Sequence, residues 1–342
     1  ELGKRQKAFR EDYLNWMLNR CFDKMLPPID VEHLTNKVLE ALAVPPAPIS
    51  IHTFERVEGT VNSDVLLYTD SDAPISIPPG KVGDIVQFVY AQSTRPIPEV
   101  AISSALAFMA GVCGRSYNFS DSGLNLYIML IASTAIGKEA ATKGINKLID
   151  KAIESGAPTA DEFIGPSDIA SREAIIKYMS NGKPSIVSVI GEIGIRLQQM
   201  SGKYAQSHQL GLRAFFLDSF NKSGNCDKMR GIVYSDGQKN TGTLKSPAFT
   251  LLGDSTPEKF YGGLSKDQIS EGLLPRFTII EYNGDRVKRN KFHAGVMPST
   301  ELVDWVMHLC AHSSSLNQRN QVSRVQMTPE ACLLYTSDAA DD

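Results

Sequence analysis

Short apolar runs alternate along the chain with segments in which apolar residues recur at helical spacing. Four runs have the length and apolar content of buried strands: residues 124–131, 185–190, 248–252 and 277–281. Six segments show helical spacing: residues 81–91, 98–113, 138–152, 172–179, 210–220 and 300–312. Strands that alternate with helices predict an α/β fold, with a mostly parallel sheet flanked by helices.

The density of this pattern predicts the domain organisation. Residues 1–44 are expected to be a helical connector, and the proline-rich residues 45–76 a linker. The main domain is expected at residues 77–290, followed by a helical extension at 291–331. Residues 332–342 resemble a translated sequencing adapter, so they are left out of the fold prediction, and we expect the natural protein to continue at both ends.

Composition narrows the class of protein. Of the 342 residues, 42% are hydrophobic and 21% charged, which is typical of a soluble globular protein. The net charge of −3 means that any contact with nucleic acid must come from a local patch. The five cysteines form no CxxC pair, which favours a reducing cytoplasm over a zinc site or a disulfide framework. The longest apolar stretch, residues 100–114, is too short for a membrane span, so no membrane association is expected.

A turn between the first apolar strand and the following helix has the composition of a phosphate-binding loop. Phosphate binding requires successive backbone N–H groups at a helix N-terminus, and a lysine adds a positive charge. The residues of the turn are Ala132, Ser133, Thr134, Ala135, Ile136, Gly137, Lys138 and Glu139. The alternative is an ordinary strand–turn–helix with a surface lysine.

Two residues of this turn depart from the pattern GxxxxGK[ST]. Ala132 stands in place of the first glycine, which matters if that position needs a positive φ. Glu139 stands in place of the hydroxyl residue that usually holds Mg²⁺. A carboxylate at position 139 either ligates the metal directly or repels the phosphates.

The strand at residues 185–190 is followed by Gly191 and Glu192. In P-loop enzymes a carboxylate at this place orients the attacking water or binds Mg²⁺ through a water. Gly191 stands where an aspartate is usual, so Glu192 is the predicted catalytic residue and a second candidate Mg²⁺ ligand beside Glu139. The alternative is a solvated glutamate in a turn.

Several strings in residues 77–285 resemble one protein family in order and spacing. They are Ile77-Pro-Pro-Gly-Lys-Val-Gly-Asp84, Arg95-Pro-Ile-Pro-Glu99, Gly137-Lys138-Glu139, Phe163-Ile-Gly-Pro-Ser167, Gly191-Glu-Ile-Gly-Ile-Arg-Leu-Gln-Gln-Met200, Gly253-Asp-Ser-Thr-Pro-Glu258 and Glu271-Gly-Leu-Leu-Pro-Arg-Phe277. The chain is similar here to RecA-like P-loop ATPase domains of unknown detailed function, which occur in phage and mobile-element proteins of the primase/helicase type.

The resemblance implies binding of ATP with Mg²⁺ and a ring-forming homo-oligomer, such as a hexamer, that acts on single-stranded DNA. A primase domain, in the same or another chain, is the implied partner. Gly137-Lys138-Glu139 corresponds to the nucleotide-binding turn, and Glu192 to the position after the Walker B strand. The expected function is therefore a helicase-like motor domain of a DNA replication protein.

Three further residues are candidates for the same site. Ser255 or Thr256, after the strand at 248–252, could face the γ-phosphate, and either would also serve as a helix N-cap before Pro257. Arg276 could act as an arginine finger, from its own or a neighbouring subunit, or pair with a carboxylate inside its own domain.

Scattered basic residues could bind DNA phosphates. The candidates are Lys222, Lys228, Arg230, Lys239 and Lys245. No aromatic residues are interleaved with them, so base stacking is not predicted, and a solvated charged face is the alternative.

Two other functions remain open from the sequence. One is an assembly module that binds nucleotide without hydrolysing it, which the absence of Ser or Thr at position 139 favours. The other is a DNA-packaging or transposition ATPase, which would share the core but need a nuclease or partner-binding domain.

Overall fold

The computed structural model of the chain describes five stretches: residues 77–119, 121–201, 205–224, 227–262 and 272–326. The predicted connector at 1–44, the linker at 45–76 and the adapter-like residues 332–342 lie outside them.

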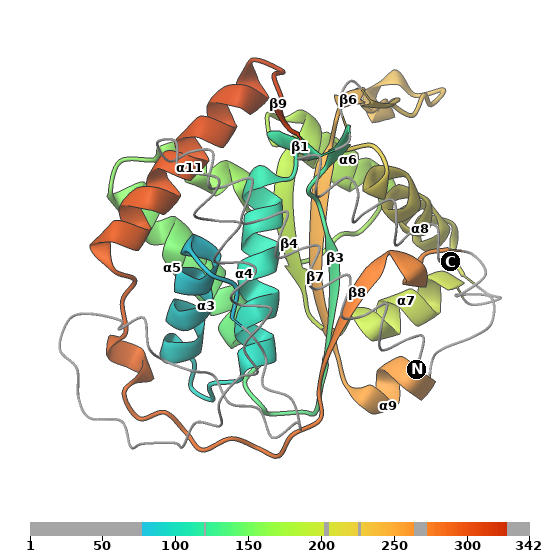
Figure 1. Ribbon diagram of the computed structural model, residues 1–342. Helices are drawn as coiled ribbons and strands as arrows, with labels where there is room; N and C mark the ends of the chain where they lie inside the picture. Colours follow the sequence, from blue (N-terminus) through green and yellow to red (C-terminus); the bar gives the residue numbers. More distant parts are fainter. Residues whose placement is uncertain (1–76, 120, 202–204, 225–226, 263–271, 327–342) are drawn as a thin grey trace.

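A sheet of four parallel strands forms the centre of the molecule (Figure 1). Its strands are β3 (Tyr127–Ala132), β4 (Ser185–Ile190), β7 (Ala248–Ser255) and β8 (Phe277–Tyr282). The order across the sheet is β4-β7-β3-β8, and every neighbouring pair is parallel. The prediction of an α/β fold with a parallel sheet between helices is confirmed.

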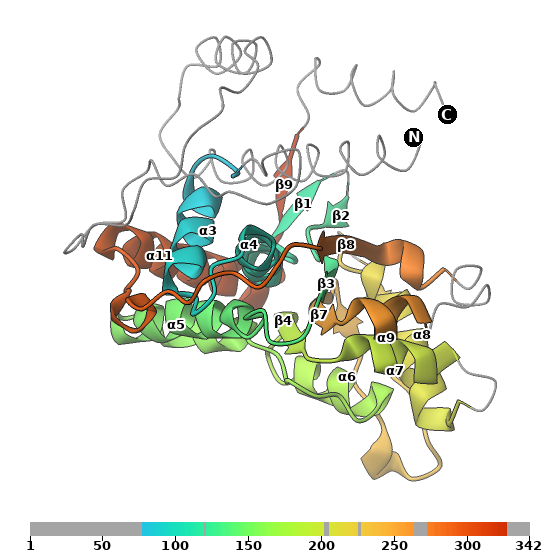
Figure 2. The same ribbon diagram turned by 90° about the horizontal axis from the view of Figure 1, so that it is seen from below.

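Helices cover both faces of this sheet (Figure 2). On one face α4 (Pro98–Cys113) packs against the strands, and α3 (Lys81–Gln92), α5 (Ala140–Glu154) and α11 (Thr300–Gln318) pack around it in the same apolar cluster. The other face packs against α6 (Arg172–Ser180), α7 (Ile193–Ser201), α8 (Ser207–Phe220) and α9 (Pro257–Gly262). The central strands are buried from both sides, which explains why they are almost wholly apolar in sequence.

Smaller elements complete the described part of the chain. A second sheet consists of β1 (Tyr117–Phe119), β2 (Ser122–Gly123) and β9 (Ser323–Val325), and a two-stranded one of β5 (Lys228–Met229) and β6 (Leu244–Lys245). The 3-10 helices are η1 (Pro158–Phe163), η2 (Gly237–Lys239), η3 (Leu274–Arg276) and η4 (His293–Gly295).

The apolar core on the α4 side extends past residue 290. Leu302, Val306, Leu309 and Cys310 of α11 are buried in the same cluster as α3, α4 and α5. The helix that the sequence placed in a separate C-terminal extension therefore packs as part of the main body.

Helix α4 is buried along almost its whole length. Its two buried serines form hydrogen bonds inside the core: Ser103 donates to the Glu99 carbonyl and Ser104 to the Ala141 carbonyl. Gly111 lies against β4 so closely that a Cβ atom there would be 2.6 Å from Cβ of Val187. This glycine is what allows the helix to approach the sheet.

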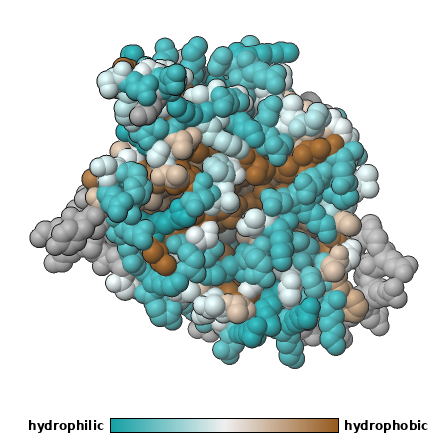
Figure 3. Space-filling view, turned by 180° about the vertical axis from the view of Figure 1, so that it is seen from behind, coloured by the Kyte–Doolittle hydropathy of each residue, from teal (hydrophilic) through white to brown (hydrophobic). Residues whose placement is uncertain are grey.

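Seen from behind, hydrophilic residues dominate, and the visible apolar ones form a band that runs across this face (Figure 3). Among the described residues, no helix combines the length and the apolar character that crossing a bilayer requires.

Candidate functional site

The carboxyl ends of the central strands meet at one edge of the sheet. The pairing of Ile131 with Ser255 and of Ile190 with Gly253 brings the ends of β3, β4 and β7 to this edge. From β3 the chain crosses to β4 at one side of the sheet, and from β7 it later crosses to β8 at the other side. The direction of the connections therefore reverses between β3 and β7. In open parallel sheets, ligands bind at the carboxyl edge beside such a reversal. The residues 132–139, called here the 132–139 turn, begin at this point.

The backbone of the 132–139 turn is left-handed at two positions. Ala135 has φ 62° and Gly137 has φ 105°. A Cβ atom at Gly137 would lie 3.1 Å from Cβ of Arg95 and 3.2 Å from its carbonyl oxygen, so both the conformation and the close approach favour glycine.

The replacement of the first glycine by Ala132 is explained by the same backbone. Ala132 is the last residue of β3 and pairs with Tyr282 of β8, and it is not among the residues with a positive φ. Its methyl group is completely buried. An alanine therefore fits this position without strain.

The backbone donors of the turn are available to an anion. Among the described residues, the backbone hydrogen bonds outside helices and strands include none donated by the N–H groups of residues 133–139, and the first comes from Ala140 to the Gly137 carbonyl. Ser133, Thr134 and Ala135 are exposed. N–H groups at the start of a 15-residue helix, α5, attract negative charge.

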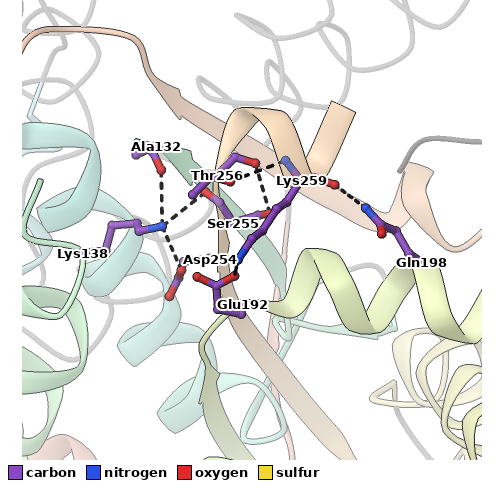
Figure 4. A network of polar contacts seen from close by, with 8 residues as sticks. All are labelled: Ala132, Lys138, Glu192, Gln198, Asp254, Ser255, Thr256 and Lys259. Carbon is purple, nitrogen blue, oxygen red and sulfur yellow. Dashed lines mark hydrogen bonds and ion pairs between the residues drawn. The ribbon is translucent and has the colours of Figure 1, made fainter. Parts of the chain in front are cut away.

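Lys138 directs its amine to this edge of the sheet (Figure 4). Nζ lies 3.1 Å from Oδ1 of Asp254, 3.3 Å from the Ala132 carbonyl oxygen and 3.4 Å from that of Ser255. The side chain is only 14% exposed. Lys138 is thus not an ordinary surface lysine, because its charge is held inside the site by three oxygen atoms.

Glu139 takes no part in this group of contacts. Its side chain is exposed, and its backbone carbonyl accepts a hydrogen bond from Lys143 N–H as α5 begins. Within the described residues, no three His, Cys, Asp or Glu side chains are grouped so as to hold a metal ion. Mg²⁺ is compatible with fewer, because it is often bound by one or two carboxylates together with phosphates and water.

Glu192 follows β4 and lies near the same edge, with a left-handed backbone of φ 55°. Lys259 of α9 donates a hydrogen bond of 2.5 Å to its Oε2. This bond holds the pKa of the Glu192 carboxyl below its usual range, and the charge of Lys138 acts in the same direction. Glu192 is therefore an ionised, half-exposed carboxylate. The positive charge of Lys138 is near enough to lower its pKa, although the two side chains form no ion pair.

Ser255 and Thr256 lie beside the site but direct their hydroxyl groups elsewhere. Ser255 faces α7, since a Cβ atom at Gly194 would be 2.3 Å from its Oγ, and it meets Lys138 only through its backbone carbonyl. Thr256 Oγ1 accepts a hydrogen bond from Lys259 N–H at 3.5 Å. The geometry thus matches the predicted N-cap role for Thr256.

Arg276 lies at the opposite edge of the sheet. It immediately precedes β8, whose first residue, Phe277, pairs with Tyr127 at the start of β3. Its guanidinium donates to the Gly272 carbonyl and lies 5.8 Å from the centre of the Phe220 ring. The structure does not bring Arg276 to the 132–139 turn of its own chain.

The predicted DNA-contact residues are also remote from the turn. Lys228 of β5 pairs with Lys245 of β6, and β6 precedes the amino end of β7. Arg230 is exposed, Lys222 partly buried, and Lys239 ends η2. In Figure 1 β6 lies at the top of the molecule and α9, which follows the carboxyl end of β7, at the bottom.

Asp254 is the residue of this site that the sequence analysis missed. It lies on β7, between β4 and β3, and pairs with Leu130. The sequence does show an aspartate just after an apolar strand, in the string that begins at Gly253. Only the order of the strands, however, places this carboxylate beside Lys138.

Compared with protein-family models, with curated proteins and with solved structures, the chain gives no match.

Proposed function

We propose that this chain is an ATP-binding domain that hydrolyses ATP with Mg²⁺ and works as a motor on DNA, in a replication protein of a phage or mobile element. The observation that carries the nucleotide-binding part is the position of Lys138. Its amine lies at the carboxyl edge of the sheet, at the start of α5, and forms an ion pair with Asp254 near the end of β7.

Each residue of the site has a role in this proposal. The N–H groups of the 132–139 turn bind the phosphates, and Lys138 neutralises their charge. Glu192, ionised at neutral pH, accepts a hydrogen bond from the attacking water and orients it. When bound, ATP would supply the phosphoryl group, and Mg²⁺ would offset its negative charge.

The fit of Mg²⁺ to the chain rests on the donors at the edge of the sheet. Asp254 and Glu192 supply carboxylate oxygens, which suit this hard cation, and Asp254 is 26% exposed and thus reachable from solvent. Glu139 is exposed, so it can rotate toward or away from a phosphate.

The motor part of the proposal rests on the motifs in residues 77–285. One feature of the sheet supports the hydrolysis part: β7 lies between the strand that leads into the turn and the strand that ends before Glu192. A group at the end of β7 therefore adjoins both the phosphate-binding residues and the residue proposed to orient water.

The test of hydrolysis compares wild type with Glu192→Gln, using Glu258→Gln on α9 as the control because Glu258 is exposed and near the same edge. Glu192→Gln is expected to bind ATP but to lower kcat at least about 100-fold, because the neutral amide is a far weaker base and hydrogen-bond acceptor for water than the carboxylate. Glu258→Gln should hydrolyse ATP like wild type. Single-stranded DNA should stimulate the wild-type rate, and equal rates for all three proteins would contradict the role of Glu192.

A second function is favoured by two observations. Glu139 replaces the hydroxyl ligand, and Glu192 is already hydrogen-bonded to Lys259. Both features suit an assembly module that binds ATP without hydrolysing it. Wild type that binds ATP but releases no phosphate, with or without DNA, would establish this alternative.

A further inference from the structure

Asp254 is the only residue of β7 whose carboxylate lies at the carboxyl edge of the sheet. Along β7, side chains alternate between the two faces: Leu252 lies in the core beside α4 and α5, and Gly253 faces Ile193 of α7. Asp254 therefore points to the same face as Leu252. That is the face on which the 132–139 turn leads into α5.

The Asp254 carboxylate lies beside the position where a side chain is missing on the neighbouring strand. Ile190 pairs with Gly253, so Gly191 follows at the level of Asp254. A Cβ atom built on Gly191 would have one neighbour within 4 Å, Oδ2 of Asp254, at 3.7 Å. Gly191 stands where P-loop enzymes usually have an aspartate. Here Asp254 of the neighbouring strand β7 lies next to that position.

The two carboxylate oxygens of Asp254 have different neighbours. Oδ1 forms the ion pair with Lys138, at 3.1 Å, while Oδ2 faces the open space above Gly191. A partly exposed carboxylate in this position can exchange the lysine for another cation and stay paired throughout. An unpaired charge so close to the core would be costly.

We propose that Asp254 is the carboxylate that holds the Mg²⁺ ion of the bound nucleotide, in place of the ligands absent at positions 191 and 139. The inference rests on the proposed function, since it names the metal-binding residue of the same site. Nucleotide binding then exchanges partners: Lys138 leaves Asp254 for the phosphates, and the carboxylate of Asp254 accepts the cation. The Lys138–Asp254 pair is the resting state of this exchange.

The first experiment measures the affinity for ATP with Mg²⁺ and with EDTA, in wild type, Asp254→Asn and the control Glu258→Gln. Wild type and the control should gain about tenfold or more in affinity from Mg²⁺, and Asp254→Asn should lose most of this gain. In EDTA, Asp254→Asn should bind ATP at least as tightly as wild type, because Lys138 loses its ion pair and one negative charge is removed. A thermal melt without nucleotide verifies that the variant is folded.

The second experiment moves the carboxylate to the neighbouring strand. Gly191 has no positive φ and has room for a Cβ atom, so Gly191→Asp can be combined with Asp254→Asn. The double variant should recover the Mg²⁺-dependent gain in affinity, and it should also recover Mn²⁺ binding in the presence of ATP, measured by electron paramagnetic resonance. A purely structural role of Asp254 would not be restored in this way.

The outcomes separate the inference from the proposed function. A wild-type chain that binds no ATP in either buffer overturns both. Wild type that binds ATP, together with an undiminished Mg²⁺ gain in Asp254→Asn, overturns the inference alone. Loss of the gain without recovery in the double variant also counts against it, because a carboxylate at position 191 should reach the same space.

Discussion

At the residue scale, the hydrogen bond from Lys259 lowers the pKa of Glu192, the carboxylate proposed to orient water. Lys259 belongs to α9 and Glu192 precedes α7, and the bond of 2.5 Å joins the two elements. Both side chains are about half exposed, so the pair adds little to stability, on the order of 1 kcal/mol or less. Its main effect is on protonation.

This gives a prediction for pH dependence. The pKa of Glu192 is lowered in the fold, first by the hydrogen bond from Lys259, so the carboxylate stays ionised to lower pH than an ordinary glutamate. Lys259→Ala should raise this pKa toward its usual value, and the acid limb of the ATPase pH profile should move to higher pH. The small stability that the pair contributes should be present above the ordinary pKa of glutamate and lost as the pH falls through the lowered one.

The control for this shift is Lys143→Ala, which removes an exposed lysine from α5. Its pH profile should coincide with that of wild type. An acid limb that stays in place in Lys259→Ala would mean that Glu192 does not control the rate.

At the scale of elements, most helices and strands were predictable because each has a clear apolar period. Helix α4 and strand β4 begin and end where the pattern indicated. Helix α5 begins at Ala140 rather than at Lys138, because residues 133–139 form the turn. The strands β1, β2, β5, β6 and β9 escaped prediction, since two or three residues carry no period.

The packing of helices on the sheet can be tested with two glycines. Gly111→Ala would place Cβ 2.6 Å from Cβ of Val187, so it should destabilise the protein by about 1–3 kcal/mol despite the better helix propensity of alanine. Gly211→Ala in α8 meets only Cβ of Arg172, at 3.6 Å, and should instead stabilise by up to about 1 kcal/mol. Urea denaturation measures both, and equal effects would contradict the close contact of α4 with β4.

At the scale of the whole molecule, the order of the strands determines which predicted residues share a site. The parallel sheet brings the 132–139 turn and Glu192 to one edge, as the sequence predicted from the ends of their strands. The parallel order also separates Arg276 from the 132–139 turn. Arg276 precedes its strand, so it lies at the amino edge of the sheet, whereas the turn lies at the carboxyl edge. Asp254 could not be assigned from the sequence, because periodicity does not reveal that β7 lies between β3 and β4.

The central claim is that the 132–139 turn binds ATP through Lys138, and equilibrium binding of ATP to the 342-residue chain tests it most directly. Wild type should bind ATP, Lys138→Ala should lose at least about tenfold in affinity, and the control Lys143→Ala should match wild type. Binding by Lys138→Ala that equals wild type, or no binding by wild type, would contradict the account.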